Sequence, residues 1–66
     1  MTLKQLREDH DISQTDFAAM LGIGRASLIR YEQGIRTPPP KVANRIAQEF
    51  NLSIEEIWAM FYDRPA

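Results

Sequence analysis

The sequence predicts an all-α fold of five short helices and no strand, in a single domain over residues 1–66 with its core over about residues 3–61. Three observations lead to this prediction. Apolar residues recur at the spacing of one helix face in successive segments. Helix-capping residues, glycines and prolines separate these segments. The chain of 66 residues has the length of one small domain, which buries only about 60% of its unfolded surface and so has a thin core.

The composition limits how such a small domain is stabilised and where it works. It contains no cysteine, so neither a disulfide nor a thiolate metal site contributes, and we expect a cytoplasmic protein. No apolar run approaches the roughly 20 residues that span a bilayer, and no signal peptide is visible, so we expect no membrane partner. Helix packing must therefore hold the fold, with dimerisation as a further contribution.

The first predicted helix covers about residues 3–9. Thr2 and Gln5 form a capping-box pattern at its start, and Leu6 lies on its apolar face. His10, the one histidine of the chain, follows this helix. A histidine at a helix end usually caps the helix or lies on the surface, so we assign it no catalytic or ligand-binding role.

The stretch from Ser13 to Gly34 predicts two short helices joined by a tight turn. Ser13 and Asp16 form a capping-box pattern at the start of the first of them. Its apolar residues share one face at positions i, i+1 and i+4, and they are Phe17, Ala18 and Leu21. Gly22 follows at the place where helices often end in the left-handed conformation.

The second helix of this pair is predicted from Arg25 to Gln33, because Gly24 can cap its start and Gly34 ends it. Across so short a turn the two helices must cross steeply, and a small residue in the first lets the second come close. The spacing of a helix-turn-helix unit is carried by Ala18, Gly22 and Leu28.

This second helix has two different sides at about 100° per residue. Leu28 and Tyr31 point to one side. The other side spans an arc of roughly 140° without a carboxylate, and its residues are Arg25, Ala26, Ile29, Arg30 and Gln33. Arginine matches guanine acceptors, glutamine can pair with adenine and apolar groups can meet the thymine methyl, so this side suits the major groove of DNA. The alternative is an amphipathic helix whose arginines only solvate it, and the turn before the helix argues against it.

The charge distribution favours DNA although the net charge is −1. Residues 14–45 hold five basic and two acidic side chains and so carry a charge of +3, whereas residues 46–66 carry −3 and residues 1–13 carry −1. A local positive patch can attract DNA without a basic overall charge. We expect the acidic end to face away from DNA.

The segment after Gly34 predicts a stiff connector, because the prolines of residues 38–40 cannot continue a helix. Arg36 and Lys41 flank the connector, and we expect both to contact phosphates. An amphipathic helix follows, with its apolar face formed by Val42, Ala43, Ile46, Ala47 and Phe50.

The last predicted helix begins after Asn51, which can take a left-handed conformation at the end of the preceding helix. Ser53 and Glu56 form a further capping-box pattern. The apolar residues of this helix are Ile54, Ile57, Trp58 and Phe61.

Patterns of catalytic, metal or cofactor sites are absent. There is no HExxH motif, no cluster of cysteine and histidine for zinc, and no recognisable order of serine, histidine and acid. Gly22 and Gly24 form a GxG sequence, but no strand precedes it and no phosphate-loop lysine follows. We therefore expect no enzyme activity, no cofactor, no metal and no small-molecule ligand.

The chain resembles the Cro/C1-type (XRE-family) helix-turn-helix domains of phage and bacterial transcriptional regulators. The resemblance covers nearly the whole chain and is carried by ISQTDFAAMLGIGRASLIRYEQG, a proline-containing loop and IAQEFNLSIEEIW. It implies a compact, five-helix, lambda-repressor-like domain with the helix-turn-helix at helices 2 and 3. It also implies binding to double-stranded operator DNA as a homodimer.

The resemblance implies roles for individual residues as well. Gln14 corresponds to the glutamine that touches a phosphate, and the residues that read bases correspond to Arg25, Ala26 and Arg30. Ser27 could reach a phosphate or be inert. Two positions depart from the family: Gly24 stands where Ser or Thr is common, and Ile29 where a polar residue is usual. Ile29 would then meet a thymine methyl or a protein partner.

The predicted function is that of a sequence-specific transcriptional regulator, of the phage or prophage repressor type, that binds a palindromic operator through helix 3. The alternative is a small helical protein-interaction module, such as an antitoxin or antirepressor, whose main partner is a protein. A steep salt dependence of DNA affinity would favour the first function, because phosphate contacts release counterions.

Three structural predictions accompany this function. The core should contain Leu6, Phe17, Ala18, Leu21, Leu28, Ile46, Phe50 and Ile57. Glu32 lies about 40° from Leu28 on helix 3, and the resemblance implies that it pairs with Arg7. The apolar end of the chain should bury part of its surface against a second copy, or else simply close the core, and it is formed by Trp58, Met60, Phe61 and Tyr62.

Overall fold

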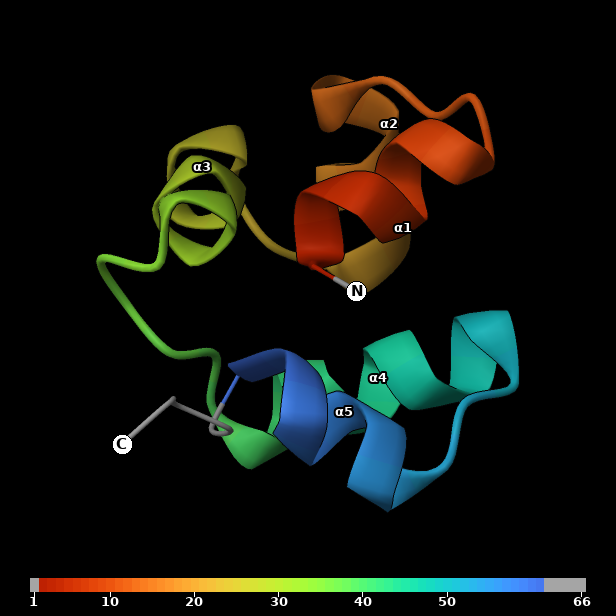
Figure 1. Cartoon of the computed structure of the whole chain (residues 1–66). Coiled ribbons are helices and arrows are strands. Elements are labelled where there is room, and N and C mark those ends of the chain that lie inside the picture. The colour runs from red at the N-terminus through yellow and green to blue at the C-terminus, as the bar shows by residue number, and fades with distance from the viewer. Residues whose placement is uncertain (1, 62–66) are drawn as a thin grey trace.

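The computed structural model describes residues 2–61, which contain five helices and no strand (Figure 1). The predicted all-α fold is confirmed. The helices are α1 (Leu3–Asp9), α2 (Gln14–Leu21), α3 (Arg25–Gln33), α4 (Pro40–Phe50) and α5 (Ile54–Phe61). Figure 1 shows α1, α2 and α3 grouped on one side and α4 and α5 on the other, with the segment after α3 joining them.

The helices begin at the predicted capping residues. At α1 the full capping box is present, because the Gln5 N–H donates to Thr2 Oγ1 (3.1 Å) and the Thr2 N–H donates to Gln5 Oε1 (2.9 Å). The hydroxyls of Ser13 and Ser53 accept from backbone N–H groups in the first turns of α2 and α5, each at 3.1 Å. Local side-chain chemistry thus determines where these helices start.

Four helices end in the same way, with one residue in the left-handed conformation: Asp11, Gly22, Gly34 and Asn51. At each of these ends, the N–H of the following residue donates to the carbonyl oxygen five residues before it, over 2.9–3.2 Å. This is the Schellman arrangement, in which an apolar residue usually follows and packs back on the helix. The residues in that place are Ile12, Ile23, Ile35 and Leu52.

Three of these four apolar residues pack against the core, and Ile35 does not. Ile35, in the connector after α3, is 72% exposed. The local motif is the same at all four ends, so the difference arises from tertiary packing.

The core lies between the two groups of helices and contains the residues that sequence periodicity predicts, with one correction. Phe50 is half-buried and packs at the edge of the core, where its ring stands 5.6 Å from that of Phe17. The other seven predicted core residues are buried. His10 caps α1 as expected: its Nδ1 lies 2.8 Å from the Leu6 carbonyl oxygen, and its ring also packs edge-on with that of Phe50, at a centroid distance of 4.8 Å.

Two further features of the described residues bear on function. None of the helices within residues 2–61 has the length and apolar character that crossing a membrane would require. Tyr62, part of the predicted dimer surface, lies outside the described residues.

Candidate nucleic-acid interface

Helix α3 packs one side on the protein and leaves the other open. Leu28 is completely buried and Tyr31 nearly so. On the opposite side Arg25, Ala26, Arg30 and Gln33 are exposed and Ile29 is half-buried. Ser27, which lies at the border between the two sides, about 40° from Tyr31, is half-buried as well. The division into two sides is the one that the 3.6-residue period predicts.

The turn between α2 and α3 holds this open side at a fixed angle. Gly22 adopts φ 70°, and both its N–H and that of Ile23 donate to the carbonyl oxygen of Ala18. Ala18 is 3% exposed beneath α3. Its side chain is a single methyl group, and this small size lets α2 and α3 come close together. Gly24 precedes α3 without a side-chain cap, which leaves the first N–H groups of α3 free of that partner.

A buried ion pair ties α3 to α1, as predicted. Arg7 Nε donates to Glu32 Oε2 at 2.7 Å and Arg7 Nη2 donates to Glu32 Oε1 at 3.3 Å. The side chains are 12% and 4% exposed, respectively. Arg7 Nη1 also donates to the Ile12 carbonyl oxygen (3.0 Å). The hydrogen bond to Glu32 raises the pKa of the Arg7 guanidinium above its ordinary value.

Gln14, the first residue of α2, joins this pair to α3. Its Nε2 donates to Glu32 Oε1 (3.4 Å), and its Oε1 accepts from Arg25 Nη2 (3.2 Å). Sequence reasoning assigned the amide to a phosphate and missed both hydrogen bonds. No local pattern could reveal them, because they join residues that are 18 and 11 positions apart.

Two of the predicted phosphate contacts lie beyond α3 along the chain. Arg36 is exposed in the connector and Lys41 is exposed in the first turn of α4. The predicted site has four basic residues: Arg25, Arg30, Arg36 and Lys41. Within residues 2–61, none of them forms an ion pair with a carboxylate. Their charges are therefore available to an external anion.

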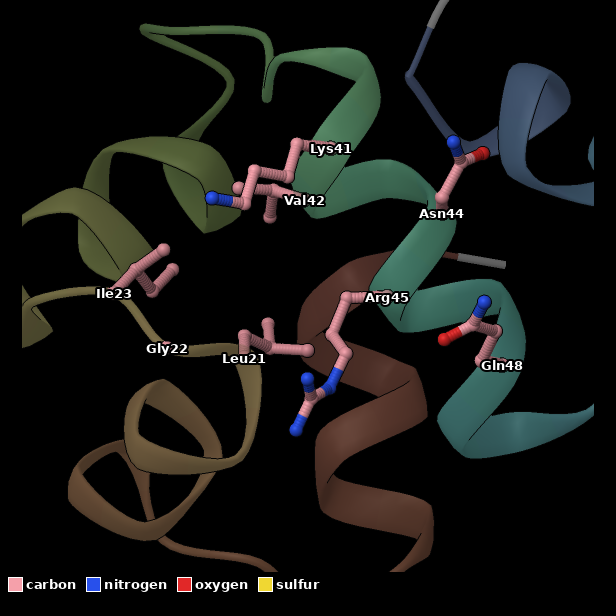
Figure 2. A pocket seen from close by; sticks show the side chains of 8 residues that line it. All are labelled: Leu21, Gly22, Ile23, Lys41, Val42, Asn44, Arg45 and Gln48. Atoms are coloured by element: carbon pink, nitrogen blue, oxygen red, sulfur yellow. The ribbon is translucent and has the colours of Figure 1, made fainter.

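A surface hollow of about 480 Å³ lies between the α2–α3 turn and α4. Figure 2 shows Lys41 and Arg45 extending from α4 over this hollow toward Leu21 and Ile23. Sequence reasoning left Arg45 out of the site; it stands one helical turn after Lys41 and donates through Nε to Glu49 Oε1 (3.1 Å). In the part of the chain that is described, no three histidine or acidic side chains gather as metal ligands would.

Comparison with known proteins places this arrangement in a family. The family model described as "Helix-turn-helix" matches residues 3–57. Antitoxin PezA of Streptococcus pneumoniae is 42% identical over 55 residues, which are 83% of this chain and 35% of that protein. The uncharacterized HTH-type transcriptional regulator MJ0272 of Methanocaldococcus jannaschii is 39% identical over 56 residues, which are 85% of each chain.

A third relative is the cryptic phage CTXphi transcriptional repressor RstR of Vibrio cholerae, which is 26% identical over 55 residues, 83% of this chain and 50% of that protein. The chain thus spans about a third of the length of PezA, half that of RstR and most of MJ0272. No solved structure matches it. From the family match, the position of the α2–α3 turn and the open side of α3, we conclude that the chain belongs to the Cro/C1-type (XRE) helix-turn-helix family of transcriptional regulators.

Proposed function

We propose that this chain is a sequence-specific DNA-binding transcriptional repressor that acts in the cytoplasm and inserts α3 into the major groove of a palindromic operator. The observation that carries the proposal is the open side of α3, which presents two arginines without a carboxylate partner among residues 2–61. A helix that serves only solubility usually carries charges of both signs on its outer side. The relative RstR, a phage repressor by name, supports the repressor role.

The residues divide into base-reading and backbone-binding groups under this proposal. Arg25 and Arg30 would pair with guanine, Gln33 with adenine, and Ala26 and Ile29 would meet thymine methyl groups. Backbone contacts position a protein on DNA without specifying the sequence. We assign those contacts to Gln14, Ser27, Arg36 and Lys41.

A homodimer follows from the palindromic operator, and α5 offers a surface for it. Ile54 and Trp58 stand one helical turn apart on α5 and are 43% and 58% exposed. Met60 and Phe61 pack against the core instead. A two-fold dimer would place the two α3 helices about 34–36 Å apart, one turn of DNA. Light scattering that finds only monomer, both free and on a palindromic duplex, would contradict the dimer.

The second candidate function is that of a protein-interaction module such as an antitoxin. The relative PezA, an antitoxin by name, favours it. The exposed Ile35 in the connector and the half-buried Ile29 on the outer side of α3 favour it as well. The two functions differ in the partner that the outer side of α3 would contact.

Selecting bound sequences from a random pool of DNA tests the proposed function. We expect one palindromic sequence to be enriched. The logarithm of its affinity should fall linearly with the logarithm of the salt concentration, with a slope of about −0.9 for each phosphate contact. Binding without a preferred sequence would reject sequence-specific DNA reading, and the absence of a salt dependence as well would favour the protein-interaction module.

A further inference from the structure

A chain of hydrogen bonds runs from the interior of the domain to the first arginine of α3. It begins at the buried Arg7–Glu32 pair, passes through the half-buried Gln14 and ends at the exposed Arg25. Three helices contribute to it: α1, α2 and α3. The inner end is rigid, because Arg7 holds both carboxylate oxygens of Glu32 and donates to a backbone carbonyl as well.

The chemistry of the groups permits one orientation of the Gln14 amide. An ionised carboxylate only accepts hydrogen bonds and a guanidinium only donates them. The amide must therefore turn its NH₂ toward Glu32 and its oxygen toward Arg25. The flipped amide would set two acceptors against each other at Glu32 and two donors against each other at Arg25.

We infer that Gln14 is a positioning residue, which holds the guanidinium of Arg25 in place for base reading and is itself oriented by the Arg7–Glu32 pair. The inference rests on the proposed function, since it concerns how Arg25 meets DNA. An exposed arginine otherwise samples many rotamers and loses that freedom when it binds a base. The Gln14 oxygen removes part of this loss before DNA arrives.

The geometry leaves Arg25 able to bind a base while Gln14 holds it. The contact with Gln14 takes one of the two hydrogens on Nη2, and the guanidinium has five N–H donors in all. Two parallel donors remain for the O6 and N7 acceptors of guanine. Gln14 likewise keeps a second hydrogen on Nε2 for a phosphate, so the backbone contact and the positioning role are compatible.

The test compares Gln14→Met, Arg25→Ala and the double variant with the unaltered chain. Methionine keeps the length and helix propensity of glutamine but forms no such hydrogen bonds, and Glu32 retains both bonds from Arg7. Gln48→Met, on the exposed surface of α4, is the matched control, and urea melts verify that each variant folds. The measured quantity is the ratio of affinity for the selected duplex to affinity for a scrambled duplex, with the base preference at each position.

We expect Arg25→Ala to lower the affinity ratio about tenfold or more and Gln14→Met to lower it about three- to tenfold, within the cost of ordering an arginine. Both should relax preference at the same base positions. In the Arg25→Ala background, Gln14→Met should leave the affinity ratio unchanged, because the loss of its phosphate contact weakens binding to both duplexes alike. An unchanged ratio in Gln14→Met, beside a loss in Arg25→Ala, would overturn the inference and leave the proposed function standing. A ratio that survives Arg25→Ala would overturn the inference too. No preference in the unaltered chain would reject the proposed function itself, and the inference with it.

Discussion

The inner and outer sides of α3 differ in burial and in the pairing of their charges, although both belong to one helix of nine residues. On the inner side Leu28 and Tyr31 are buried, and the carboxylate of Glu32 is fully engaged. On the outer side Arg30 and Gln33, the neighbours of those residues in sequence, are exposed. One helix thus divides stability and recognition between its two sides, and substitutions should separate the two properties.

The largest expected effect is on the inner side, at Glu32. Glu32→Ala leaves Arg7 charged and nearly buried without its partner, so we expect a loss of about 3–5 kcal/mol in the free energy of unfolding, measured by urea melts. Glu49→Ala is the matched control, because it removes the exposed pair with Arg45, and should cost about 0–1 kcal/mol. Equal costs for the two variants would mean that burial does not distinguish these ion pairs.

The raised pKa of Arg7 adds a pH dependence to this prediction. A base whose pKa is higher in the folded state contributes stability at every pH below its unfolded pKa and loses it as the pH rises through the folded value. The guanidinium of Arg7 therefore keeps its contribution throughout the neutral and moderately alkaline range. The measurement is the free energy of unfolding against pH. A loss between about pH 7 and about pH 9 that disappears in Arg7→Met would contradict this prediction.

A smaller effect is expected beneath α3, at the corner with α2. Ala18→Leu would overpack the place where the two helices approach and should cost about 1–3 kcal/mol of unfolding free energy. Ala19→Leu makes the same change on the exposed side of α2 and should cost less than about 0.5 kcal/mol. If urea melts give the two variants the same stability, the close approach at Ala18 is not a constraint.

The smallest effect on stability is expected on the outer side of α3. Arg30→Ala and Gln33→Ala remove exposed side chains that have no ion pair among the described residues. Each should change the free energy of unfolding by no more than about 0.5 kcal/mol in thermal or urea melts. A loss above about 1 kcal/mol would assign this side a structural role.

Much of the fold could be predicted because its determinants are local. Thr2, Ser13 and Ser53 begin helices through bonds to residues three positions away, and Gly22 and Gly34 end them. The inner side of α3 follows from the helical period. The Arg7–Glu32 pair was accessible through the family resemblance, since 25 positions separate the two residues.

Features that depend on how helices pack could not be predicted from local patterns. The left-handed Asp11 had no signal, because aspartate tolerates this conformation without requiring it. The bond from Arg25 to Gln14 depends on the angle between α2 and α3. Ile35 and Ile23 follow left-handed glycines in the same motif, yet tertiary packing exposes the first and half-buries the second. The assignment of DNA-contacting residues stays a prediction.

Affinities of Arg25→Ala, Arg30→Ala and their double variant for the selected operator and for random duplex test most directly whether the outer side of α3 reads bases. Each arginine should account for about 1–3 kcal/mol of discrimination, so both single variants should lose far more affinity for the operator than for random DNA. Lys41→Ala is the control: it should weaken both complexes alike and reduce the salt slope by about one. An operator-to-random ratio that remains intact after both arginines are removed would contradict base reading by α3 and favour a protein as the partner of this surface.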